Sequence, residues 1–206
     1  MPRVSEAHLA ARRRQILDAA NHCFVRNGFH GTSMQDVIGE AGLSVGAVYR
    51  YFTGKHELIK AIAEENLGKI IGTVDEFAMI EPQPPLRDLA ERIMDLFDAE
   101  SEEETGMIRL AVQVWGESLR DPELAAMVTT IYRAIRGRCV VLAERARAAG
   151  QLGKEADPAA VAAALFGLTI GYAIQRLLIG DPDRVEYIAG IHGLMTSASS
   201  TVTPNT

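Results

Sequence analysis

The sequence has little of what disulfide-linked, metal-binding or secreted proteins need. Its only two cysteines, Cys23 and Cys139, form no CxxC pair and stand among apolar residues, so we expect buried thiols in a reducing cytoplasm. The histidines are scattered, and none has the spacing of a metal ligand pair, so neither a metal nor a cofactor is predicted. The N-terminus lacks an apolar segment after its basic residues, and a secretory signal is not expected.

Long uncharged runs are also missing. The longest extends from Pro158 to Gln175 and is followed by Arg176. It is shorter than the roughly 20 residues that a helix needs to cross a bilayer. We therefore interpret this run as a buried helix of a soluble protein.

Positive charge is scarce in the chain as a whole, whose formal net charge is −6, but not at its start. Residues 1–60 contain eight Lys or Arg and five Asp or Glu, a net charge of +3, whereas residues 61–206 contain thirteen and twenty-two, a net charge of −9. This asymmetry would let the N-terminal quarter hold a polyanion while the acidic remainder stays clear of it.

Helical periodicity, by contrast, runs along almost the whole chain, and no alternating apolar strand of useful length occurs. We predict an all-α fold of about nine helices, separated by turn residues and by the prolines of residues 81–85. The expected helices are residues 6–26, a short helix capped by Thr32 with Gln35 completing a capping box and ended by Gly42, Val45–Phe52 capped by Ser44, and residues 56–79, 86–100, 105–118, 122–149, 158–179 and 183–198.

The stretch AGLSVGAVYRYFTGKHEL, residues 41–58, places small residues and phenol rings side by side. Two short helices joined at residues 42–44 and preceded by a long helix form the helix-turn-helix layout, whose second helix lies in the major groove of DNA. Gly46 and Ala47 would let the backbone approach the groove floor, and Val45 or Ala47 could contact a thymine methyl group. Val48 and Phe52, four residues apart, would face the core.

The remaining residues of this region suit the DNA backbone. Tyr49 and Tyr51 can donate to phosphate oxygens, and Arg50 can add charge or reach a guanine. Free N–H groups at the helix starts near Thr32, Ser33 and Lys55 favour a phosphate. The predicted DNA-binding residues are Thr32, Ser33, Ser44, Val45, Gly46, Ala47, Tyr49, Arg50, Tyr51 and Lys55.

From Arg12 to Ile59 the sequence resembles the TetR-type bacterial transcriptional repressors. The resemblance is carried by F-x-x-x-G-[FY]-x-x-T-[ST], A-G-[VL]-S-x-G-x-[IVL]-Y-x-[YH]-F and K-x-x-L, all with unbroken spacing. Two departures are Gly39, where the family usually has alanine, and Tyr51, where histidine is common. The resemblance implies a DNA-binding domain over residues 1–54, a ligand-binding and dimerisation domain over residues 55–199, and a homodimer that releases its operator when a small molecule enters the C-terminal core. The polar end of the chain predicts a flexible tail over residues 200–206.

Two sets of residues are candidates for these C-terminal roles. Small residues at helical spacing permit close helix approach and would suit a dimer interface, although packing inside one chain would use them equally. This set comprises Ala163, Gly167, Gly171, Ile174, Leu178, Ala189, Gly190 and Gly193. An opposite stripe that becomes polar at one end, together with aromatic and apolar walls, would suit a ligand pocket, although core packing explains each member as well. That set comprises Met94, Phe97, Trp115, Tyr132, Thr169, Tyr172 and Arg176.

Two other functions stay open. One is an all-helical enzyme or dimerisation protein whose N-terminal hairpin is only structural, although no nucleophile–base pair, paired carboxylates or phosphate-binding glycine loop is visible. GLSVG matches G-x-S-x-G literally, but that motif needs a preceding strand and here follows a helix. The other is a regulator without a small-molecule input, acting as a repressor or an activator.

Overall fold

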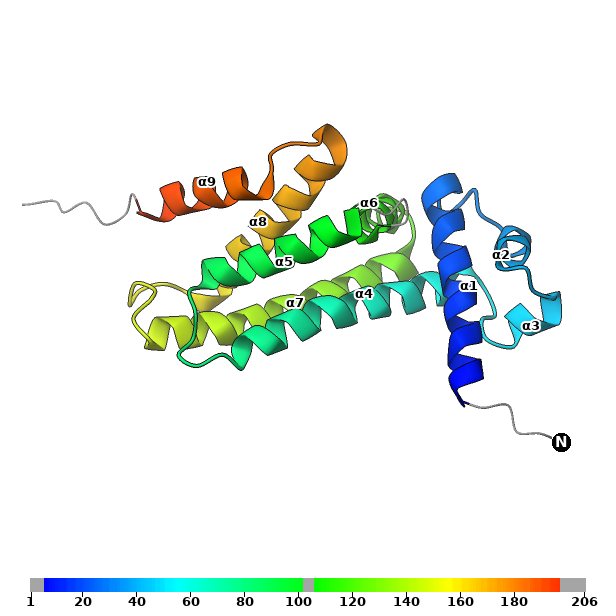
Figure 1. Cartoon of the computed structure of the whole chain (residues 1–206), viewed down its shortest axis with the longest axis horizontal. Coiled ribbons are helices and arrows are strands. Elements are labelled where there is room, and N and C mark those ends of the chain that lie inside the picture. The colour runs from blue at the N-terminus through cyan, green and yellow to red at the C-terminus, as the bar shows by residue number, and fades with distance from the viewer. Residues whose placement is uncertain (1–5, 102–105, 197–206) are drawn as a thin grey trace, which may run out of the picture. The chain divides into compact units, whose positions relative to one another are not determined.

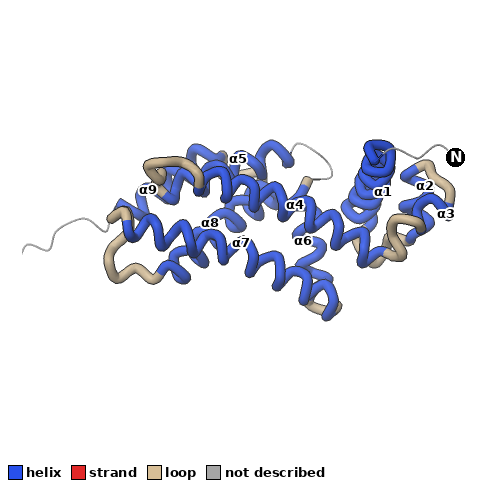
Figure 2. Tube along the Cα trace, turned by 90° about the horizontal axis from the view of Figure 1, so that it is seen from below, coloured by secondary structure: helices blue, strands red, loops and turns tan. Residues whose placement is uncertain are grey.

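The computed structural model describes residues 6–101 and 106–196, and every regular element in these ranges is a helix (Figures 1 and 2). The expected fold class and helix number are confirmed over the described residues. The helices are α1 (Glu6–Asn27), α2 (Met34–Ala41), α3 (Val45–Tyr49), α4 (Lys55–Ala78), α5 (Leu86–Ser101), α6 (Met107–Ser118), α7 (Pro122–Ala148), α8 (Pro158–Ile179) and α9 (Arg184–Thr196). The predicted tail, residues 200–206, lies outside the described residues.

The contacts divide the chain into two compact units, and both α4 and α7 contribute to each of them. Unit 1 comprises residues 1–71 and 100–135 and contains α1, α2, α3 and α6. Unit 2 comprises residues 72–99 and 136–206 and contains α8, α9 and most of α5. The predicted domain limit at residue 54 stays a prediction.

Unit 1 is organised around a core to which α1 supplies the largest share. In Figures 1 and 2, α2 and α3 lie on the same side of α1. Their apolar residues meet those of α4, α6 and α7 in one cluster, which removes this surface from water. The cluster contains Ile16, Leu17, Ala20, Cys23, Phe24, Phe29, Val37, Val48, Phe52, Leu58, Ile59, Ala61, Ile62, Leu110, Val114 and Leu124.

Unit 2 is held by buried residues of α5, α7, α8 and α9 and by polar contacts between them. The Gln83 side chain is buried and donates to the Leu142 carbonyl at 3.0 Å. Tyr187 on α9 donates to the Leu168 carbonyl on α8 at 3.0 Å. Its ring lies 5.3 Å from that of Tyr172, so α8 and α9 are joined by both apolar and polar contacts.

The helix α8 begins and ends where its capping residues predict, but its burial differs from expectation. Asp157 caps it with its carboxylate, Pro158 occupies the first turn, and Gly180 terminates it with φ 71°. It is long and apolar enough to cross a membrane by length and composition, and only 28% of its apolar window is buried within the chain. The prediction of a buried helix was therefore wrong for the single chain. One stripe faces the core and most of the remaining apolar surface is exposed or half-exposed.

Both cysteines are buried and unpaired, as the sequence predicts. Burial raises the pKa of the Cys23 thiol and raises that of Cys139 to about 11. Thiols that stay protonated at neutral pH are poor nucleophiles and poor metal ligands. Both residues therefore act as small apolar core residues.

Candidate DNA-binding site

The start of α2 is fixed by a reciprocal cap one residue later than the sequence suggested. The Ser33 Oγ accepts from the Asp36 N–H at 3.2 Å, and the Asp36 carboxylate accepts from the Ser33 N–H at 2.7 Å. These bonds lower the pKa of Asp36, the side-chain bond from Ser33 being the larger cause. The predicted box of Thr32 and Gln35 was wrong, because the Thr32 hydroxyl is used elsewhere.

The Thr32 side chain is 1% exposed. Its hydroxyl lies 2.8 Å from the Gly28 carbonyl oxygen and 3.0 Å from that of Cys23, to which it donates, so it closes the turn after α1. A contact from this hydroxyl to DNA is therefore excluded, and only the backbone of Thr32 remains available for the predicted role. Ser33 is exposed.

The turn between α2 and α3 depends on one left-handed residue. Gly42 has φ 63° and donates from its N–H to the Gly39 carbonyl at 3.1 Å, and Leu43 donates to the Ile38 carbonyl at 3.4 Å. A residue with a Cβ is strained in this conformation, which explains the glycine. Ser44 then caps α3, its Oγ accepting from the Ala47 N–H at 3.3 Å.

The five-residue helix α3 is shorter than the predicted Val45–Phe52, but the chain continues to turn after it. The N–H groups of Tyr51 and Phe52 both donate to the Val48 carbonyl, at 2.9 and 3.1 Å. Val48 and Phe52 are buried, as their spacing predicts. The anchoring face of the segment is therefore the one inferred from the sequence.

The opposite face of α3 is exposed and carries predicted DNA-binding residues. Val45 is 60% and Tyr49 is 45% exposed, large fractions for an apolar and an aromatic side chain. Ser44, Gly46 and Arg50 are exposed, and Ala47 is half-buried. Tyr51, by contrast, packs partly against the core.

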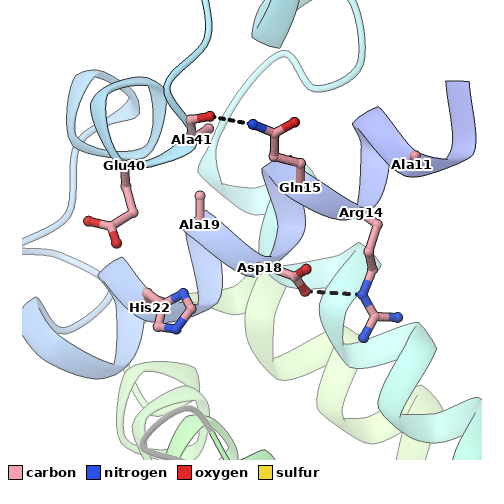
Figure 3. Close-up of a pocket in the computed structure, with 8 residues that line it drawn as sticks. All are labelled: Ala11, Arg14, Gln15, Asp18, Ala19, His22, Glu40 and Ala41. Atoms are coloured by element: carbon pink, nitrogen blue, oxygen red, sulfur yellow. Dashed lines mark hydrogen bonds and ion pairs between the residues drawn. The ribbon is translucent and has the colours of Figure 1, made fainter. Parts of the chain in front are cut away.

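A polar contact from α1, which the sequence interpretation missed, secures the end of α2. Gln15 donates from Nε2 to the Ala41 carbonyl at 2.7 Å, as Figure 3 shows. The same figure shows the groove between α1 and α2, lined also by Arg14, Asp18, His22 and Glu40. In the sequence Gln15 is one of several polar residues on α1. Its hydrogen-bond partner can be identified only after α1 and α2 have packed together.

Lys55, predicted to bind phosphate, is tied back to the turn between α1 and α2. Its Nζ donates to the Phe29 carbonyl at 2.8 Å and lies 4.8 Å from the centre of the Phe29 ring. The start of α4 is also capped by Glu57, which accepts from the Thr53 N–H at 2.5 Å and whose pKa is lowered mainly by that bond. Lys55 therefore has a structural partner beside its predicted DNA role.

The predicted ligand residues fall in two groups. In unit 2, Met94, Phe97, Thr169 and Tyr172 are buried. The Tyr172 hydroxyl donates to the Asp98 carboxylate at 2.7 Å, and Arg176 Nε lies 3.7 Å from the same carboxylate. Burial, then the Asp98 contacts, raise the pKa of Tyr172.

The second group is in unit 1, where the Trp115 and Tyr132 rings meet edge to face at 6.3 Å. A pocket formed by these residues stays a prediction. The sequence interpretation missed Asp98, whose carboxylate is the partner of Tyr172 and Arg176 in unit 2. In the sequence Asp98 is only one of many carboxylates on helices.

The predicted dimer residues share an exposed or half-exposed position on α8 and α9. They are Ala163, Gly167, Gly171, Ile174, Leu178, Ala189, Gly190 and Gly193. Leu178 is 70% exposed. Packing within the chain also favours glycine at position 171, because an added Cβ would lie 3.2 Å from the Tyr187 hydroxyl.

Two family models match separate parts of the chain. One, described as bacterial regulatory proteins, tetR family, matches residues 16–62. The other, described as BetI-type transcriptional repressor, C-terminal, matches residues 85–192, more than half of the chain. The chain belongs to the tetR family. As a tetR-family protein it is a DNA-binding transcriptional regulator and not an enzyme.

Curated relatives of this tetR-family chain are regulators too. It is 39% identical over 80 residues to a transcriptional repressor of Mycobacterium tuberculosis, covering 39% of this chain and 43% of that protein. It is 31% identical to the nicotine-responsive repressor HdnoR of Paenarthrobacter nicotinovorans, covering 59% of this chain and 61% of HdnoR. The matches thus span less than two thirds of both relatives. With UidR of Escherichia coli the identity is 28%, covering 77% of this chain and 78% of UidR.

Solved structures agree over nearly the full length. GusR of Salmonella enterica matches with a TM-score of 0.73 and 25% identity, covering 95% of this chain and 98% of GusR. SmeT of Stenotrophomonas maltophilia, solved as a complex with triclosan, matches with a TM-score of 0.77 and 26% identity, covering 95% of this chain and 96% of SmeT. The tetR-family chain therefore shares its helical fold with these regulators.

Proposed function

We propose that this tetR-family regulator is a cytoplasmic homodimeric repressor that binds a palindromic operator through the segment Val45–Phe52 and is released by a small molecule bound in its C-terminal domain. The observation that carries the DNA contact is the two-faced α3 segment. Val48 and Phe52 anchor it, while Tyr49 and the small residues before it face solvent. Such a helix can enter a major groove without disturbing the core that holds it.

A dimer and an effector are supported by different features. The exposed apolar side of α8 would be removed from water by a second copy, and a two-fold dimer would pair two recognition helices with two half-sites about 34–36 Å apart. The nicotine-responsive repressor and the triclosan complex are relatives whose names include a small organic compound. A ligand that prefers one spacing of the recognition helices would shift the dimer away from the operator.

The test is operator binding by Tyr49→Ala. The operator is first found by footprinting the promoter beside the gene, and affinity is then measured by fluorescence anisotropy at one fixed salt concentration. We expect Tyr49→Ala to lose about tenfold or more in affinity, because its hydroxyl is predicted to donate to a phosphate and a hydrogen bond to a charged group contributes about 1.5–3 kcal/mol. Its unfolding curve should match that of the unchanged protein, because the ring is not part of the core.

A buried neighbour provides the control. Val48→Ala should lower the free energy of unfolding by roughly 1–3 kcal/mol because it leaves a cavity in the core of unit 1. Equal operator affinity of Tyr49→Ala and the unchanged protein would contradict the placement of α3. A small molecule that raises the melting temperature and releases the DNA would support the effector half of the proposal.

A further inference from the structure

Two imidazole–carboxylate pairs join the helix-turn-helix region to α6 and to the start of α7, all within unit 1. His30, in the turn before α2, has its Nε2 2.6 Å from Oε2 of Glu117 on α6. His56, in the first turn of α4, has its Nε2 2.8 Å from Oδ2 of Asp121, which directly precedes α7. We call these four residues the histidine junction.

The Phe29 ring connects the two pairs. Its centre lies 5.9 Å from that of the His30 ring and 5.2 Å from that of the His56 ring. Phe29 is itself buried in the core that carries α2 and α3. A change in either pair would therefore act on a residue that supports the DNA-binding helices.

The carboxylate beside His56 is already held in its charged form. Asp121 Oδ1 accepts from the N–H groups of Glu123 and Leu124, at 2.9 and 3.2 Å, so it caps α7 and leaves Oδ2 for His56. The hydrogen bond with His56 is the largest cause that lowers the pKa of Asp121, followed by the backbone bond from Leu124. Asp121 is therefore an anion at physiological pH.

The carboxylate oxygen beside His30 lacks such support. Glu117 Oε2 is buried and accepts no well-aligned hydrogen bond, even though His30 Nε2 is only 2.6 Å away. A buried anionic oxygen without a donor is unfavourable, and a positive charge on the facing imidazole offsets that cost. At 2.6 Å the two groups attract each other as charges, because a charge–charge attraction does not need the alignment of a hydrogen bond.

We propose that the histidine junction is a proton-responsive contact. Imidazolium at His30 and His56 would bind the helix-turn-helix region to α6 and to the start of α7 more strongly than neutral imidazole does. Imidazole changes its charge between about pH 5 and 8. The consequence for DNA rests on the function proposed above: a tighter junction holds α2 and α3 in one arrangement and strengthens operator binding.

The direction follows from the charges that face each imidazole. Glu117 faces His30, and Asp121 faces His56. Lys55 is the cation bound to the same turn, through the Phe29 carbonyl, and it is unchanged in all variants below. The attraction is present while the imidazoles are charged and is absent when they are neutral. It is also lost at the acid end, as Asp121 becomes protonated below its lowered pKa.

The experiment compares the full-length protein with the double variant Glu117→Gln, Asp121→Asn at pH 8 and pH 6. Both substitutions preserve shape, and asparagine keeps the cap of α7. On going from pH 8 to pH 6 the melting temperature of the unchanged protein should rise by about 2–4 °C more than that of the double variant. Its operator affinity should gain about threefold more, the size expected of partly exposed ion pairs.

Two controls isolate the junction. His22→Gln removes an exposed imidazole in the α1–α2 groove and should keep the full pH response of the unchanged protein. His56→Gln leaves both carboxylates in place and should lose about half of the response; it also replaces the double variant if that one folds poorly. Any general gain of DNA affinity from protonated histidines is shared by the double variant and cancels in the comparison.

Equal pH responses of melting temperature in the unchanged protein and the double variant would overturn the proposal. A response in melting temperature without one in operator affinity would overturn its regulatory part and reduce the junction to a structural contact. If the unchanged protein binds no DNA at either pH, the function proposed above fails, and the melting temperatures still decide whether the junction responds to protons.

Discussion

At the scale of single residues, several polar side chains of the helix-turn-helix region hold the fold rather than face DNA. Thr32 closes the turn after α1, Gln15 supports the end of α2, and Lys55 reaches back to Phe29. All three residues are polar and lie in the DNA-binding region, where a polar side chain is first expected to contact DNA. Polarity alone does not separate these roles, because a buried backbone carbonyl needs a donor as much as a phosphate does.

Thr32→Val tests the structural role of that hydroxyl. Valine keeps the shape and the methyl group but leaves the Gly28 and Cys23 carbonyls without this donor, so the free energy of unfolding should fall by about 1–2 kcal/mol. Urea unfolding measures the change. Ser33→Ala is the matched control. It removes the exposed cap of α2 and should lower the free energy of unfolding by about 1 kcal/mol, so the two variants distinguish the loss of a helix cap from the loss of a buried hydrogen bond. An unchanged unfolding midpoint for Thr32→Val would contradict the assigned hydrogen bonds.

At the scale of elements, α3 is a helix of five residues that depends on its neighbours. One buried residue, Val48, and one cap, Ser44, hold it, and it is too short to be stable alone. The glycine in its first turn weakens it further, because glycine loses the most backbone freedom on becoming helical. Gly46 therefore adds nothing to the stability of α3, and close approach to DNA is the reason that the proposed function offers for it.

Gly46→Ala tests whether that reason is DNA. An added Cβ meets no atom within 4 Å, so the variant should be more stable by about 0.5–1 kcal/mol. Its operator affinity should nevertheless fall, because the methyl group would keep the backbone away from the groove floor. Gly39→Ala on α2 is an equally open position and should gain similar stability while keeping its operator affinity. If both variants bind the operator like the unchanged protein, α3 does not approach the groove as proposed.

At the scale of the whole molecule, charge and exposed apolar surface are distributed unevenly. The first 60 residues carry the net positive charge, and the acidic remainder includes α8, whose apolar side is largely open in the single chain. A large exposed apolar patch usually marks an interface. The proposed dimer would cover it and would place two basic regions on one DNA.

Gly167→Gln tests the dimer. The position is exposed and an added Cβ meets nothing within 4 Å of it in the chain, so the fold should tolerate glutamine, while a close helix contact across a dimer would not. We expect the dimer dissociation constant, measured by sedimentation, to rise by about tenfold or more. Gly137→Gln, at an open position on α7, is the control and should sediment like the unchanged protein. Gly171 is less informative, because a larger residue there would also press on Tyr187.

Local signals in the sequence were enough for the order and type of the helices, the end of α2 at Gly42 and the buried face of α3. These features depend on periodicity, capping and glycine, which act over a few residues and can be read without knowing what packs against them. The partners of Thr32, Gln15 and Lys55, the histidine junction and the open side of α8 could not be read in this way. Each joins residues far apart in the chain or depends on what covers a helix, and such pairings exist only once the helices have packed, because many polar side chains compete for the same few carbonyls and carboxylates.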